Sequence, residues 1–148
     1  MTDNTYLLGI DFGTESVRAA IFDLAGRPVS FAATAYRTTH PHPGWAEQDP
    51  EEWWEALQAS CRKVIAASGV SPAAIKGISY DATTMTVVAM DKRGEALRPA
   101  IMWMDVRATE QAARAEKSDS VARLYNGRGT APATAEWYPF KAAWLRQN

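Results

Sequence analysis

The sequence predicts an α/β fold in which a mixed sheet, with three antiparallel strands, is flanked by helices. Three apolar segments open the chain, at residues 6–10, 17–22 and 29–36, and short turns join them. Strands that are joined by short turns pair in the antiparallel sense, so these segments form one sheet. A helix, two further strands and two further helices are predicted in the rest of the chain.

Two glycine-containing turns connect the three strands. Residues 11–16 join the first pair and contain Gly13, and Asp23-Leu24-Ala25-Gly26 joins the second pair. Glycine lets a backbone turn tightly without a steric cost.

A helix is predicted to begin at Asp49 and to end at Gly69. Asp49 is a suitable N-cap, Pro50 suits the first helical position, and Glu52 completes a capping box three residues after the cap. Apolar residues then recur at helical spacing, at Trp54, Leu57, Cys61 and Val64. The helix therefore covers one face of the sheet.

In the second half of the chain, two short strands are followed by two helices. Strands are expected at residues 76–80 and 86–90, a turn at residues 91–94, and helices at residues 105–117 and 138–147. The segments 37–48 and 125–134 are rich in Gly and Pro and are predicted to be loops.

This order of elements is similar to that of an RNase H-like domain, the fold type of the actin, hexokinase and Hsp70 superfamily. With 148 residues and 47% hydrophobic composition, the chain is long enough for a single domain of this type. A fold likeness alone gives no function.

The composition argues against several classes of partner. The formal net charge of -1 gives no reason to expect a nucleic acid or an anionic membrane, so a small molecule is the expected partner. The first residues lack the layout of a secretory signal, and we expect a cytoplasmic location. Cys61 has no partner for an internal disulfide, and His40 and His42 are interpreted as loop residues.

The turn after the first strand carries the strongest chemical signal. Gly13 lets the backbone approach a phosphate closely, while the hydroxyls of Thr14 and Ser16 add donors. Asp11, at the end of the strand, is placed to hold hydrated Mg²⁺. The alternative is a tight hairpin whose Asp only accepts turn amides.

Residues 9–18 resemble the first phosphate motif of this superfamily and, in extended form, that of the FGGY carbohydrate kinases. Three further segments, 44–54, 103–108 and 141–145, resemble FGGY motifs and occur in the family order. Four spaced motifs that span nearly the whole chain make coincidence improbable, although each motif alone is weak.

The resemblance implies an ATP-dependent, Mg²⁺-requiring sugar kinase, of which residues 1–148 are the amino-terminal part. The phosphate contacts that it implies are Asp11, Gly13, Thr14, Glu15, Ser16 and Arg18, with Asp11 also at the metal. In the family the catalytic base is an Asp in the second half of the protein, so none is expected before Asn148 and the chain alone should be inactive. A homodimer is compatible with the resemblance.

The segment Trp103-Met104-Asp105-Val106-Arg107 resembles the W-x-D-x-R of the family's sugar site. A polyol needs charged partners for its hydroxyls and an aromatic wall for its C–H face, which Asp105, Arg107 and Trp103 can offer. The alternatives are an N-cap role for Asp105, a surface position for Arg107 and a core position for Trp103.

Other candidate sugar contacts are Asp81, Trp45 and Glu136. The segment 79–84 has the D-x-T pattern of ribulose kinases, rather than the Arg-Glu of glycerol-using members or the Met-His of xylulose-using members, which favours a ketopentose. Asp81 could also be a turn residue, and Trp45 could hold its loop on the domain. The alternative functions are a xylulose- or glycerol-type kinase and an actin- or Hsp70-like nucleotide-switching ATPase.

Overall fold

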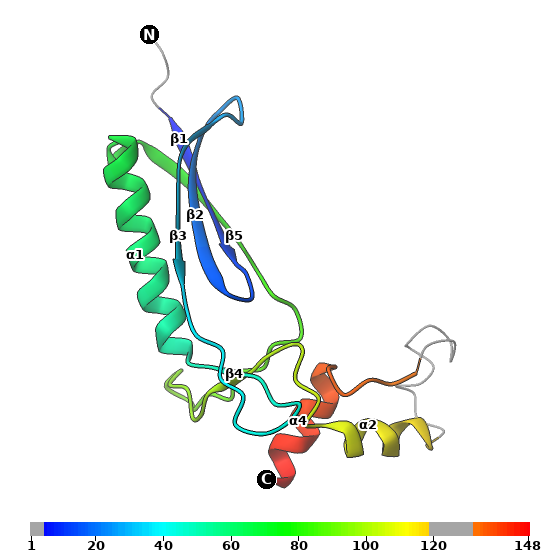
Figure 1. Cartoon of the computed structure of the whole chain (residues 1–148). Helices are drawn as coiled ribbons and strands as arrows, with labels where there is room; N and C mark the ends of the chain where they lie inside the picture. The colour runs from blue at the N-terminus through cyan, green and yellow to red at the C-terminus, as the bar shows by residue number, and fades with distance from the viewer. Residues whose placement is uncertain (1–4, 119–131) are drawn as a thin grey trace. The chain divides into compact units, whose positions relative to one another are not determined.

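The computed structural model describes residues 5–118 and 132–148, and its internal contacts divide the chain into two compact units (Figure 1). We call them the sheet unit, Met1–Arg37 with Asp49–Thr83, and the loop unit, Thr38–Gln48 with Thr84–Asn148. The prediction of a single domain stays a prediction, and each unit is described by itself.

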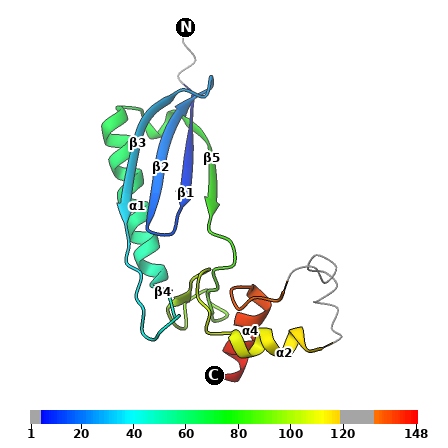
Figure 2. The ribbon, with the colours of Figure 1, turned by 45° about the vertical axis from the view of Figure 1, so that its right-hand side comes forward.

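The sheet unit contains a four-stranded mixed sheet in the order β3-β2-β1-β5 (Figure 2). Its first three strands pair antiparallel and the fourth lies parallel to β1, which confirms the predicted sheet. The strands are β1 (Tyr6–Phe12), β2 (Ser16–Asp23), β3 (Pro28–Ala35) and β5 (Ile75–Ala82).

Helix α1 (Pro50–Ser68) covers one face of this sheet, as predicted. The Asp49 side chain accepts a hydrogen bond from the Glu51 amide at 3.0 Å, and Gly69 ends the helix in the left-handed region, with φ 66°. Buried residues of β1, β2 and α1 form the core beneath it, namely Leu8, Ala19, Ile21 and Val64.

The capping-box role expected for Glu52 is wrong. Its carboxylate accepts the Arg37 amide at 3.0 Å and an Arg37 guanidinium nitrogen at 2.8 Å. Glu52 therefore ties the helix to the chain that leaves β3. The 3-10 turn η1 (Pro72–Ala74) then leads into β5.

The other face of the sheet is apolar at one end and polar at the other. Side chains alternate between the two faces of a strand, so the residues between the core positions point away from α1. Among them Leu7 is 42% and Phe31 62% exposed, and Asp11 and Arg18 follow toward the carboxyl end of β1. This arrangement places the charged residues at the β1–β2 hairpin.

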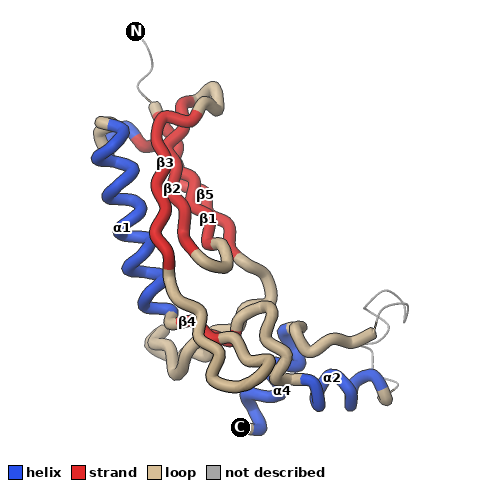
Figure 3. Tube along the Cα trace, in the orientation of Figure 1, coloured by secondary structure: helices blue, strands red, loops and turns tan. Residues whose placement is uncertain are grey.

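In the described residues of the loop unit, helices α2 (Thr109–Glu116) and α4 (Tyr138–Gln147) are joined to loops and short strands (Figure 3). Helix α2 packs on α4, around Ala108, Ala112 and Phe140. Strands β4 (Glu47–Gln48) and β6 (Ala100–Ile101) form a two-stranded antiparallel sheet.

Three predictions in this unit need correction. Residues 86–90 form only isolated bridges, Val87 with Ile101 and Met90 with Ala96, although the turn at 91–94 is present. The segment 37–48, expected to be a loop, contains β4. Helix α2 begins four residues later than expected, because the Asp105 side chain binds the Arg107 amide in a turn. Most of the loop expected at 125–134 lies outside the described residues.

Candidate phosphate and sugar sites

The hairpin between β1 and β2 is tight at Gly13. The Gly13 amide donates to the Ser16 carbonyl at 3.0 Å, and a side chain at Gly13 would bring its Cβ to 3.3 Å from that oxygen. A larger residue at this position would therefore press on the Ser16 carbonyl, which would have to shift by a few tenths of an ångström. Thr14 and Ser16 are half-buried beside it, and Glu15 is exposed.

Tyr36 holds this hairpin in place, a role that the sequence did not indicate. Its amide donates to the Glu15 carbonyl at 3.1 Å, and its hydroxyl donates to the Gly13 carbonyl. Burial, together with the nearby Asp11 carboxylate, raises the pKa of the Tyr36 hydroxyl to about 12. The hydroxyl therefore keeps its proton and remains a donor over the whole neutral range.

Asp11 and Arg18 lie opposite each other in the β1–β2 register and form an ion pair of 2.8 Å. Their side chains are 43% and 52% exposed, so both groups remain accessible to a ligand. A half-exposed carboxylate fits hydrated Mg²⁺, which takes one or two protein carboxylates and completes its shell with water and phosphate oxygens. Within the described residues, no group of three or more His, Cys, Asp or Glu side chains forms a metal cage.

A hollow of about 300 Å³ opens beside this ion pair. Asp81 belongs to it, because Asp81 pairs with Asp11 in the parallel β1–β5 register. The structure thus brings Asp81 beside Asp11 and Arg18, two of the residues predicted to bind phosphate. The other residues that line the hollow and carry side chains of chemical interest are Arg18, Phe31, Ser79 and Tyr80.

In the loop unit, Asp105 and Arg107 form a buried ion pair. The two carboxylate oxygens accept from the Arg107 Nε at 2.9 Å and Nη2 at 2.8 Å. They also accept the backbone amides of Arg107 at 2.9 Å and Ala46 at 2.6 Å. Both side chains are 0% exposed.

The guanidinium of Arg107 is enclosed on its remaining sides. Its Nη1 donates to Glu47 at 2.7 Å, and Glu47 also pairs with Arg98 at 2.8 Å. The Arg107 Cζ lies 3.8 Å from the ring centroid of Trp45 and 5.0 Å from that of Trp144. Arg107 is therefore an interior residue and does not occupy the surface position left open by the sequence.

Hydrogen bonding keeps both members of this pair ionised. Burial alone raises the pKa of the Asp105 carboxyl, but hydrogen bonds from Arg107 and from the Ala46 amide hold it below its ordinary value. Burial likewise acts to lower the pKa of Arg107, and its bonds to Asp105 and Glu47 raise it. Because all of Asp105's contacts are internal, the geometry favours its turn-ordering role over direct sugar contact.

Trp103 and Glu136 are more accessible. The Trp103 side chain is 42% exposed, so it is not the core residue that the sequence left as an alternative. Glu136 is half-buried, and a hydrogen bond from Thr134 lowers the pKa of its carboxyl. Trp45 contacts Arg107 and packs edge-on against Trp144, with ring centroids 5.3 Å apart, which fits the loop-holding alternative.

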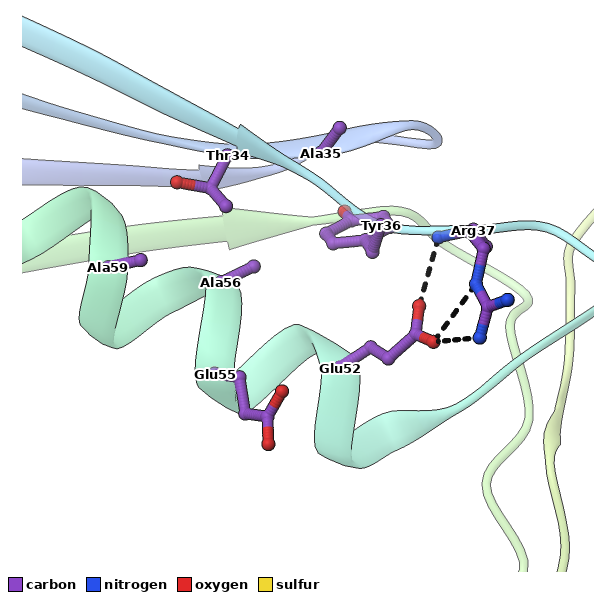
Figure 4. Close-up of a pocket in the computed structure, with 8 residues that line it drawn as sticks. All are labelled: Thr34, Ala35, Tyr36, Arg37, Glu52, Glu55, Ala56 and Ala59. Atoms are coloured by element: carbon purple, nitrogen blue, oxygen red, sulfur yellow. Dashed lines mark hydrogen bonds and ion pairs between the residues drawn. The ribbon is translucent and has the colours of Figure 1, made fainter.

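A second hollow, of about 500 Å³, lies between the end of β3 and the start of α1 (Figure 4). Its charged residues are Arg37, Glu52 and Glu55, and Arg37 and Glu52 pair with each other. None of the residues predicted for the phosphate or sugar sites lines it. We assign no chemistry to it.

Comparisons with known proteins agree with this fold. The model of the amino-terminal domain of the FGGY family of carbohydrate kinases matches residues 6–148. A xylulose kinase structure from Brucella ovis superposes with a TM-score of 0.86 at 29% identity, over 97% of this chain and 29% of that one. The fold and the matched residues define a domain of the carbohydrate kinase class. The chain belongs to the FGGY family.

Curated relatives carry two different substrate names. A glycerol kinase from Variovorax paradoxus is 33% identical over 97% of this chain, which corresponds to 29% of that protein. A xylulose kinase from Staphylococcus epidermidis is 34% identical over 74% of this chain and 22% of that protein. The chain therefore spans less than a third of the length of these relatives.

Proposed function

We propose that the protein containing this chain transfers the γ-phosphoryl group of ATP to a hydroxyl of a ketopentose, ribulose-like, or of a related polyol. The observation that carries the proposal is the half-exposed Asp11–Arg18 pair beside the tight Gly13 hairpin, in a chain of the FGGY family. Phosphoryl transfer needs positioning and charge stabilisation more than covalent chemistry by the protein.

The sheet unit supplies the phosphate contacts. Asp11 would hold Mg²⁺ through its carboxylate, and the metal would neutralise charge on the transferred phosphoryl group. Arg18 orients Asp11 and has further N–H donors for phosphate oxygens. Backbone and hydroxyl donors of Thr14 and Ser16 line the same hairpin.

The loop unit supplies sugar contacts. The exposed Trp103 ring offers an apolar wall to the C–H face of a sugar. Asp105 and Arg107 act by ordering the turn that carries Trp103 and by holding Trp45. The general base comes from outside residues 1–148, so the chain alone is inactive.

A sugar panel tests the proposal. We expect ADP release from MgATP that depends on a ketopentose, measured on the protein as its gene encodes it. Glycerol and xylulose belong in the panel, since the curated relatives carry those names. ATP hydrolysis that no sugar stimulates would indicate a nucleotide-switching ATPase instead. The same assay on residues 1–148 alone is expected to show no turnover.

A further inference from the structure

Lys141, on α4, carries a charge into the interior of the loop unit. Its side chain is 0% exposed, and among the described residues no carboxylate forms an ion pair with it. A buried charge without a carboxylate partner is costly unless hydrogen bonds replace those of water. We therefore looked for a role of Lys141 that would account for the cost of burying its charge.

The hydrogen bonds of Lys141 go to three backbone carbonyls. The Nζ donates to Met102 at 2.6 Å, Trp103 at 2.9 Å and Met85 at 3.1 Å. An ammonium group has three N–H donors, so its donor capacity is filled. Because all three oxygens bind one nitrogen, the Met85 and Trp103 carbonyls lie within about 6 Å of each other.

Two of these three partners, Met85 and Trp103, lie 18 residues apart in sequence, and each has an exposed apolar side chain. Met85 is 46% exposed and Trp103 is 42% exposed. Met85 also has a φ of 60°, in the left-handed region that long side chains rarely adopt, so its surroundings must hold it there. The bond from Lys141 is one such constraint.

We propose that Lys141 is a positioning residue for the sugar site, which fixes the two turns so that Met85 and Trp103 present their side chains to the substrate in a set geometry. The proposal rests on the function proposed above. An indole and a thioether suit the C–H face of a sugar, because both are large, apolar and polarizable.

The position of Lys141 on helix α4 accounts for the burial of its side chain in the loop unit. The helix begins after Trp137, with Pro139 in its first turn, and buries Phe140 against α2. Lys141, the next residue, is directed into the unit by the same packing. The charged groups near its ammonium are Asp105, Glu136 and Arg107. The two carboxylates favour the charged form and the arginine opposes it.

The test compares steady-state kinetics of variants in the protein as its gene encodes it. Lys141→Met keeps the size of the side chain but removes all three donors. We expect its sugar KM to rise about ten- to a hundredfold, as for displaced contacts in a binding site, while the KM for MgATP and the kcat stay within about threefold. Lys92→Met, at an exposed turn of the same unit, is the matched control and should match the parent.

Met85→Ala provides a second, independent arm. Met85 is exposed, so this variant should fold even where Lys141→Met does not, and its sugar KM should also rise, with Met90→Ala as the exposed control. A parental sugar KM in Met85→Ala overturns the proposal. The proposal is also overturned if Lys141→Met folds, has the same sugar KM as the parent and differs from it only in a lower melting temperature.

Failure of the proposed function gives a different result. In that case the unmodified protein shows no sugar-dependent ADP release with any member of the panel, and the positioning role of Lys141 is overturned together with the proposed function. If the parent is active and the variants keep its sugar KM, only the role of Lys141 is overturned.

Discussion

The Arg107 guanidinium lies over the Trp45 ring, with its Cζ 3.8 Å from the ring centroid, while the same guanidinium binds Asp105 through two nitrogens. One side chain thus combines a planar stacking contact with a two-point ion pair. Lysine cannot reproduce either, because its ammonium is a compact point charge.

We therefore predict that Arg107→Lys destabilises the chain in spite of its unchanged charge. The loss should be about 2–4 kcal/mol in the free energy of unfolding, because buried charged hydrogen bonds are broken. Urea denaturation measures it. Arg93→Lys, at an exposed pair with Asp91, should leave the midpoint near that of the parent. Equal midpoints for both variants would contradict an interior role for Arg107.

Low pH should weaken the ion pair between Asp105 and Arg107. The pKa of Asp105 is lowered in the folded chain, so its contribution to stability is complete above the ordinary Asp value of about 3.9 and is lost as pH falls through the folded value. Asp105→Asn removes this titration. We expect the difference in unfolding free energy between the parent and Asp105→Asn to shrink below about pH 4. A difference that is constant from pH 2 to 7 would argue against the pair.

The N-cap role that the sequence left open for Asp105 is wrong, because the N-cap of α2 is Ala108. Asp105→Ala separates the predicted sugar contact from the turn-ordering contact with the Arg107 amide. If Asp105→Ala lowers the melting temperature and leaves direct sugar titrations unchanged, Asp105 only orders its turn. Weaker sugar binding together with a parental melting temperature would instead support direct contact, which the 0% exposure of the side chain does not favour.

The sequence predicted the sheet unit well because its signals are local. Alternating apolar residues, short glycine turns and the Asp49 cap each act within a few residues. The partner of Glu52 could not be predicted in this way. Arg37 lies 15 residues away in sequence, and it meets Glu52 where α1 packs against β3.

The loop unit was predicted less well because its contacts are long-range. Asp105 accepts the amide of Ala46, 59 residues away, and Lys141 binds the carbonyl of Met85, 56 residues away. No local pattern specifies such contacts. Lys141 stood inside a recognised motif, yet a lysine is usually exposed, and only the structure shows that this one is buried.

Tyr36→Phe should loosen the hairpin between β1 and β2. The change leaves the Gly13 carbonyl without its hydroxyl donor, which typically costs about 1 kcal/mol. Amide hydrogen exchange at Gly13 should accelerate, since its bond to Ser16 lies in the same hairpin. The exposed Tyr138→Phe serves as the control. Unchanged exchange at Gly13 would mean that the hairpin holds its shape without Tyr36.

Asp11→Asn should abolish most turnover with little effect on stability. Its ion pair with Arg18 is half-exposed and contributes at most about 1 kcal/mol, whereas loss of metal binding should lower kcat at least about a hundredfold. Asp23→Asn, at the opposite end of the sheet, tests for a general charge effect. Parental activity of Asp11→Asn at limiting Mg²⁺ would exclude the metal role.

Because of Lys141, the free energy of unfolding should change with pH in the alkaline range. Burial lowers the pKa of its ammonium to about 8, against the opposing effects of Asp105 and Glu136. Between this value and the ordinary 10.5, the unfolded chain binds more protons than the folded chain, so the free energy of unfolding rises with pH. The full gain is on the order of 1–3 kcal/mol.

Denaturation at several pH values between 7 and 10.5 measures this effect in the parent and in Lys141→Met. The variant has no group to titrate at this position, so the parent should gain stability relative to it as pH rises. The sugar KM should rise over the same range, because a neutral amine keeps only two of the three donors that hold Met85, Met102 and Trp103. Parallel stability curves for the two proteins would show that the ammonium is as favourable inside the loop unit as it is in water.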